Sequence, residues 1–131
     1  MDCLFCKISA GEIPSYKIYE DDYVFAFLDI NPDSNGHTLI IPKKHFQDLD
    51  DIDIDTLKYI NSASKKIKKL LEEKLHCDGM SLLQNNGSVQ EVKHYHMHLK
   101  PYYKDNVSIK LIKNEKAIDN VENVYKKLKE D

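Results

Sequence analysis

The chain has 131 residues, a length that fits one compact domain and leaves little room for a second. Hydrophobic residues make up 41% of it, enough for a packed core, and the formal net charge of -3 argues against a protein that binds nucleic acid through its overall charge. No apolar run approaches the roughly 18 residues that span a bilayer, and the N-terminus lacks the basic start and apolar stretch of a signal peptide. We therefore expect a cytoplasmic protein with neither nucleic acid nor a membrane as partner.

The first half of the chain predicts one helical turn and three short strands. The helical turn covers residues 5–10, before a loop that begins at Gly11. The strands lie between turn-forming segments, over residues 16–20, 23–29 and 37–41. Pro42 ends the third strand, because proline has no N–H to donate to a ladder.

The second half predicts one long helix, two strands and a terminal helix. Apolar residues recur at helical spacing between residues 56 and 75, at Leu57, Ile60, Ala63, Ile67, Leu70, Leu71 and Leu75. Lysines crowd the other side of this helix, which we interpret as a solvated face. The remaining elements are strands over residues 80–83 and 93–99 and a helix over residues 121–128. This order indicates an α+β fold built on an antiparallel sheet of about five strands.

Three histidines alternate with apolar residues at His94, His96 and His98. On a strand, alternate side chains share a face, and three imidazoles in register indicate a reactive site better than a core histidine or a solvated face does. Zinc held by two of the rings is a second reading, but one ion cannot bind all three, since the outer pair lies about 13 Å apart on a flat strand. A neutral imidazole is a good nucleophile toward phosphorus, and a backbone carbonyl can fix its tautomer.

The segment from Gln90 to Leu99 resembles the signature of the histidine triad (HIT) family, in which histidines alternate with hydrophobic residues after a glutamine. Other segments resemble the family in the same order, at residues 13–14, 20–22, 25–30 and 37–45. The resemblance covers residues 3–101 and is closest to small dimeric HINT-like and bacterial HIT proteins. It implies a single HIT domain over residues 1–131 with a variable tail from residue 105, and a homodimer.

The resemblance also implies the reaction. His96 would attack the α-phosphorus of a nucleotide and form a nucleotidyl-histidine intermediate, from which water releases a nucleoside monophosphate. His98 would donate to the phosphate and pass a proton to the leaving group, His37 would orient the cluster, and Gln90 would contact the leaving group. Because all 19 basic residues are lysines, no guanidinium fork could hold the phosphate.

The substrate implied by the resemblance is a purine nucleotide conjugate, with adenosine as the expected nucleoside. Its bond would be that of a nucleoside phosphoramidate or a dinucleoside polyphosphate. Asp29 would accept the ribose hydroxyls, and Asn85 would lie near the sugar. An apolar slot for the base would come from Phe5, Ile8, Phe27, Leu28 and Ile30. No organic cofactor is expected.

A metal site is implied at the N-terminus. Cys3 and Cys6 have the two-residue gap that lets two thiolates reach one zinc ion. By resemblance to some bacterial members, His45 and His94 would complete the site. Four protein ligands close the coordination sphere, so this zinc would be structural, and His96 and His98 would remain for chemistry.

One departure from the family pattern bears on turnover. The loop over residues 85–90 is shorter than expected, and Val89 stands where a glycine is common. Valine is stiffer and bulkier than glycine beside a phosphate. A nucleotide-binding protein with little turnover is therefore one alternative to the enzyme. A zinc-organised interaction module, in which the histidines are only ligands, is the other.

Overall fold

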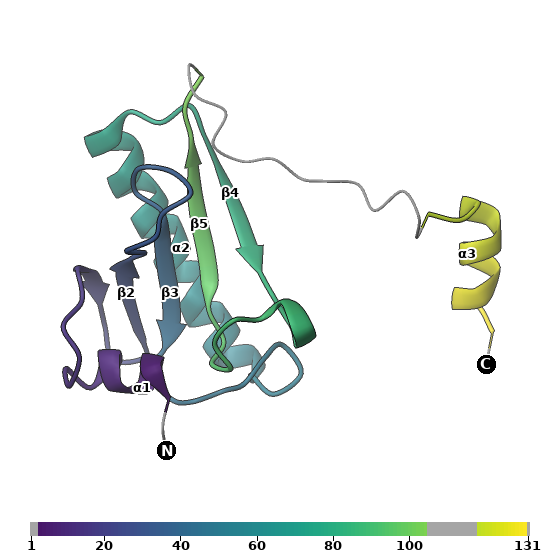
Figure 1. The fold of residues 1–131 in the computed structure, drawn as a ribbon, viewed down its shortest axis with the longest axis horizontal. Coiled ribbons are helices and arrows are strands. Elements are labelled where there is room, and N and C mark those ends of the chain that lie inside the picture. Colours follow the sequence, from purple (N-terminus) through teal and green to yellow (C-terminus); the bar gives the residue numbers. More distant parts are fainter. Residues whose placement is uncertain (1–2, 105–117, 131) are drawn as a thin grey trace.

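A computed structural model describes residues 3–104 and 118–130 of the chain; the rest of the predicted variable tail, residues 105–117 and 131, lies outside them. The fold is mixed α/β around one antiparallel sheet of five strands, in the order β1-β2-β3-β5-β4 (Figure 1). The strands are β1 (Lys17–Glu20), β2 (Val24–Leu28), β3 (Thr38–Pro42), β4 (Gly79–Gln84) and β5 (Met97–Tyr102). The predicted α+β class and the antiparallel five-stranded sheet are confirmed.

The helices are α1 (Leu4–Ser9), α2 (Ile54–Leu75) and α3 (Val121–Leu128), with a short 3₁₀ turn at Gly87–Val89. Helix α2 begins after Asp53, whose side chain accepts a hydrogen bond from the Thr56 amide, a typical N-cap. It ends at His76, which adopts a left-handed φ of 56° and caps the last turn. None of the described helices combines the length and apolar character that a bilayer crossing needs.

Apolar side chains bury both faces of the central strands. On β2, Val24 and Ala26 point into the core that α2 covers, while Phe25 and Phe27 point into a second core on the opposite face. Helix α2 lies behind the sheet in Figure 1, and α1 covers part of the other face with Phe5 and Ile8. Each fully buried side chain of this kind contributes roughly 1.5–3 kcal/mol to folding. The second core forms the floor on which the histidines stand.

The histidine segment differs from its prediction in one respect. The strand predicted over residues 93–99 begins only at Met97, and residues 93–96 run outside the ladder. If the antiparallel register that pairs Met97 with Ile40 continued, His96 would lie opposite Ile41 and Tyr95 opposite Pro42, which has no N–H to donate. The Tyr95 amide instead donates to the Phe46 carbonyl at 2.7 Å. The predicted alternation survives, since Tyr95 and Leu99 are buried in the core under α2.

Candidate active site and Cys/His cluster

The histidine segment joins two groups of titratable side chains. The first, called the Cys/His cluster, consists of Cys3, Cys6, His45 and His94. The second, called the imidazole cluster, consists of His37, His96 and His98. His37 immediately precedes β3 and His98 lies on β5, and the pairing of these two strands sets their rings side by side. His94 and His96 lie in the non-strand segment before β5, so these two histidines, two residues apart, belong to different clusters.

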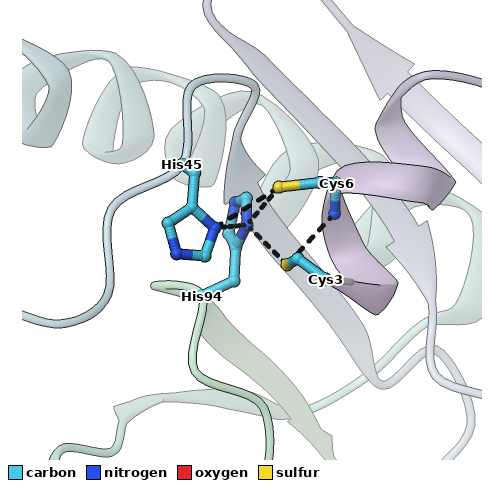
Figure 2. Close-up of side chains that lie close together, drawn as sticks. All are labelled: Cys3, Cys6, His45 and His94. Atoms are coloured by element: carbon cyan, nitrogen blue, oxygen red, sulfur yellow. Dashed lines mark hydrogen bonds between the residues drawn. The ribbon is translucent and has the colours of Figure 1, made fainter. Parts of the chain in front are cut away.

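Four ligand atoms converge in the Cys/His cluster, all within 4.8 Å of one another (Figure 2). Cys3 is the N-cap of α1 and Cys6 lies on its first turn, so the helix brings both thiols to one side. The His94 Nδ1 atom lies 3.3 Å from the Cys3 sulfur, 3.4 Å from the Cys6 sulfur and 3.2 Å from the His45 Nδ1 atom. The four residues predicted as metal ligands are therefore brought together.

The hydrogen bonds of His94 leave its Nδ1 atom available as a ligand. Its Nε2 atom lies 2.8 Å from the Pro42 carbonyl oxygen, which can only accept, so the ring proton sits on Nε2. Burial lowers the pKa of His94 to about 4, and the neutral ring then carries a lone pair on Nδ1. One lone pair cannot satisfy three heavy atoms at 3.2–3.4 Å by hydrogen bonding. The arrangement fits four donors around a common centre.

The spacing of these atoms fits zinc. A tetrahedral ion bound by thiolates and imidazoles separates its ligand atoms by about 3.3 Å for two nitrogens and about 3.8 Å for two sulfurs. The nitrogen pair at 3.2 Å and the sulfur–nitrogen pairs at 3.3–3.4 Å lie close to that range. Burial and the neighbouring Cys3 raise the pKa of Cys6 to about 11, so a cation bound beside this thiol is what would ionise it.

A directed chain of hydrogen bonds runs through His37 and His98. The Asp33 amide donates to His37 Nδ1 at 3.1 Å, which places the His37 proton on Nε2. That Nε2–H then donates to His98 Nδ1 at 2.9 Å. The neutral His98 ring therefore carries its own proton on Nε2, at the end of the chain. Burial lowers the pKa of both rings, that of His98 to about 4 with the nearby His96 and His37 as further causes.

The ligand atoms of Asp29, His37 and His98 also lie within 4.8 Å of one another. The hydrogen bonds of His37 nevertheless argue against a metal ion between them. A metal would need the lone pair of His37 Nε2, and the proton would have to move to Nδ1. There it would point at the Asp33 N–H, a donor facing a donor. We interpret His37 and His98 as a hydrogen-bond relay that begins at the Asp33 N–H.

His96 has the opposite tautomer from His94. Its Nδ1 atom lies 2.8 Å from the His94 carbonyl oxygen, so Nδ1 donates and Nε2 keeps a lone pair. Burial lowers the pKa of His96, whereas the bond to His94 and the charges of Glu91 and Asp29 act in the opposite direction. The edge of the Phe5 ring packs against His96 with centroids 5.0 Å apart. A neutral imidazole with a fixed lone pair is an activated nucleophile.

Two hollows meet at the histidines. A polar hollow of about 350 Å³ and an apolar hollow of about 290 Å³ share the side chains of Asp29, Asn31, Glu91, His96 and His98. The apolar hollow contains all the residues predicted to hold a base: Phe5, Ile8, Phe27, Leu28 and Ile30. Asn85, predicted to lie near the sugar, lines the polar hollow. A molecule with an apolar part in one hollow and a polar part in the other would contact His96 and His98, which line both.

Comparison with known proteins gives the family. Residues 10–105 match the HIT domain. The chain belongs to the HIT family. It is 42% identical to an uncharacterized HIT-like protein of Methanocaldococcus jannaschii over 97% of this chain and 98% of that one. It is 46% identical to the adenosine 5'-monophosphoramidase of Saccharomyces cerevisiae, over 76% of this chain and 61% of the yeast protein.

A solved structure of a zinc-bound histidine triad family protein from Mycobacterium smegmatis is similar to this HIT protein over most of its length. The TM-score is 0.78 and the sequence identity 36%, with 87% of this chain and 85% of that chain covered. The predicted HIT-like fold is thereby confirmed.

One predicted site residue of the HIT domain lies elsewhere than expected. Gln90 is 4% exposed and does not line either hollow. Its amide nitrogen donates to the Gln47 carbonyl at 2.6 Å, and its Oε1 atom is buried with no hydrogen-bond partner among the described residues. Val89 lines the polar hollow with a backbone that needs no positive φ, so glycine's conformational freedom is not required there.

Several residues around the hollows are not predicted as site residues from the sequence. Glu91 and Lys100 line the polar hollow, and Leu39 and Val92 line the apolar one. Lys100 follows His98 by two residues on β5, so the alternation that identified the histidines also predicts its face. Its ammonium lies 2.7 Å from the carboxylate of Asp33, in the loop between β2 and β3, and no local sequence pattern predicts this contact.

Proposed function

We propose that this HIT protein is an enzyme that breaks the bond at the α-phosphate of purine nucleotide conjugates through a nucleotidyl-histidine intermediate. The observation that carries the proposal is the pair of opposed ring atoms at the junction of the two hollows. His96 presents a lone pair there and His98 presents a proton, each fixed by a bond to its other nitrogen. The yeast relative, named as an adenosine 5'-monophosphoramidase, supports the same class of substrate.

The hollows suggest how the nucleotide binds. A purine, adenosine by resemblance, occupies the apolar hollow between Phe5 and Phe27. Asp29 lies at the border of both hollows, and the Asn31 amide donates to its Oδ1 atom at 2.9 Å, which orients the carboxylate. A carboxylate so held can accept both ribose hydroxyls. The α-phosphate then comes to lie against His96 and His98.

The chemistry has two displacements at phosphorus. His96 Nε2 forms a bond to the α-phosphorus as the bond to the leaving atom breaks in line with it. The leaving atom takes a proton through His98, and water replaces that proton. In the second step water attacks phosphorus, the bond to Nε2 breaks, and the monophosphate departs. Fixed donors aimed at the phosphate supply most of the rate enhancement.

Gln90 is assigned a positioning role in this scheme. The expected contact with the leaving group would require its buried amide to leave the Gln47 carbonyl. In its present place it ties the turn over residues 87–89 to the segment that follows His45. We propose that this tie sets the wall of the polar hollow.

We propose that Cys3, Cys6, His45 and His94 hold a structural zinc ion. A bound ion would supply no chemistry at the phosphate, because four protein ligands leave no open position. The four residues would then join the start of α1 to the histidine segment through it. The zinc-bound Mycobacterium smegmatis relative supports the choice of metal.

A homodimer is also proposed. Strand β4 ends the sheet and, among the described residues, pairs only with β5. It exposes 48% of Leu82, an apolar side chain on an open edge, which favours pairing with another chain. Sedimentation velocity tests this: the wild type is expected at the mass of two chains and Leu82→Lys at the mass of one. A monomeric wild type would contradict it.

One experiment tests the enzyme against its alternatives. Adenosine 5'-phosphoramidate is incubated with the wild type, with His96→Ala and with a matched control, His76→Asn, which removes a histidine outside the site and keeps a residue that tolerates a left-handed φ. We expect release of AMP by the wild type and the control, and an acid-labile phosphorus adduct on His96. Binding without release would favour the nucleotide-binding protein. Neither binding nor release would favour the zinc-organised interaction module.

A further inference from the structure

The polar hollow has an unbalanced set of charges. Three carboxylates line it, those of Asp29, Asp33 and Glu91, against one ammonium group, that of Lys100. His37 and His98 do not offset these carboxylates, because burial lowers the pKa of both rings and favours their neutral forms. The chain contains no arginine that could add a positive charge. The lining is therefore net negative, which is unusual beside a site that handles phosphate.

Lys100, the lysine of this lining, already forms an ion pair. Lys100 Nζ lies 2.7 Å from an Asp33 carboxylate oxygen, and its side chain is 15% exposed. A leaving group that entered the hollow as an anion would have to draw Lys100 away from Asp33. Glu91, by contrast, is an exposed side chain that lines both hollows and acts electrostatically on His96. It therefore lies at the junction of the two hollows.

The leaving group belongs in this hollow. On the proposed function, the base fills the apolar hollow and the α-phosphate lies at His96, which both hollows share. Attack in line with the breaking bond directs the leaving group away from Nε2, and the polar hollow is the remaining space at that junction. Its charges therefore act on the leaving group more than on the nucleoside.

We propose that the polar hollow selects amine leaving groups that carry a positive charge, with Glu91 as the specificity-determining residue. The substrate class is a nucleoside phosphoramidate whose amine bears a further ammonium group; sulfate and polyphosphate leaving groups are disfavoured. This inference rests on the proposed function. In the first step the Nε2–P bond forms and the P–N bond breaks, and the nitrogen takes a proton through His98. Water finally supplies the hydroxyl on phosphorus and the proton on the amine.

The test uses three adenosine 5'-phosphoramidates whose leaving amines are similar in size: 1,3-diaminopropane, butylamine and β-alanine, which present a cation, a methyl group and a carboxylate. For the wild type we expect kcat/KM to fall in that order. Each charge step should cost on the order of tenfold at low salt and less at high salt, as screening predicts. In Glu91→Gln the ratio between the cationic and anionic substrates should shrink by about the same factor, and in Glu91→Lys the order should invert.

Comparing ratios between proteins cancels the different intrinsic reactivities of the three amines. Glu73→Gln is the matched control, since it removes the same charge from α2 on the opposite face of the sheet. Its ratio should equal that of the wild type. Release of AMP at rates that do not depend on leaving-group charge, or a preference unchanged in Glu91→Gln, would overturn the charge selection and leave the proposed function standing. No release from any of the three would overturn both.

Discussion

The Cys/His cluster and the imidazole cluster use histidines two residues apart, in similar burial, for opposite purposes. His94 donates from Nε2 to the Pro42 carbonyl and turns the Nδ1 lone pair toward two thiols. His96 donates from Nδ1 to the His94 carbonyl and turns the Nε2 lone pair toward the hollows. The difference lies in which nitrogen a backbone carbonyl occupies. Neighbouring carbonyls thus decide whether an imidazole becomes a ligand or a nucleophile.

The clusters also differ in closure. The Cys/His cluster surrounds a point with four donors, while the imidazole cluster opens onto two hollows. They are nevertheless joined, because the carbonyl that fixes His96 belongs to His94, a proposed metal ligand. A substitution in the Cys/His cluster should therefore also disturb the imidazole cluster, through His94. A substitution in the imidazole cluster should leave the Cys/His cluster unchanged.

The largest expected effect is that of His96→Ala on turnover. Removing the proposed nucleophile should lower kcat by about 10⁴-fold or more. Zinc content and melting temperature should change little, because His96 donates no atom to the Cys/His cluster. Elemental analysis and calorimetry on the same preparation check this separation. A variant that loses zinc together with activity would show that the two clusters do not divide as described.

The converse change is Cys6→Ser. It removes one of the four proposed zinc donors, so bound zinc should be lost and the melting temperature should fall by roughly 10 °C or more. AMP release should fall as well, since His94 loses the restraint that positions its carbonyl. Cys77→Ser is the matched control, as Cys77 lies outside both clusters. Full zinc occupancy in Cys6→Ser would contradict the ligand set.

The relay through His37 should have a smaller effect. In His37→Ala, nothing donates to His98 Nδ1, and the ring can place its proton on either nitrogen. We expect kcat to fall about 10- to 100-fold with little change in KM, because the donor is mispositioned and the nucleoside contacts persist. Nitrogen chemical shifts of His98 should show the Nε2–H tautomer in the wild type and a mixture in the variant. An unmixed tautomer in His37→Ala would refute the relay.

Many features of the two clusters can be predicted from local sequence patterns. The others depend on contacts between residues that are far apart in the sequence. Alternation placed His96 and His98 on one face, and the two-residue gap between Cys3 and Cys6 indicated a shared ion, because both patterns are local. Strand β5 begins later than predicted because of Pro42, which lies on the neighbouring strand β3. The Gln90 bond to Gln47 and the Lys100 pair with Asp33 depend on long-range packing, which no local spacing encodes.

The smallest expected effect is the pH dependence of stability that arises in the imidazole cluster. Burial lowers the pKa of His98 from its usual 6.5 to about 4, so between these values the unfolded chain binds more protons there than the folded protein does. Stability should therefore fall as the pH drops from about 6.5 toward 4, and stay level for this group above that window. His98→Asn should flatten this part of the curve. Urea denaturation of both proteins between these pH values checks it, and equal slopes would show that His98 titrates normally, with its ring open to water.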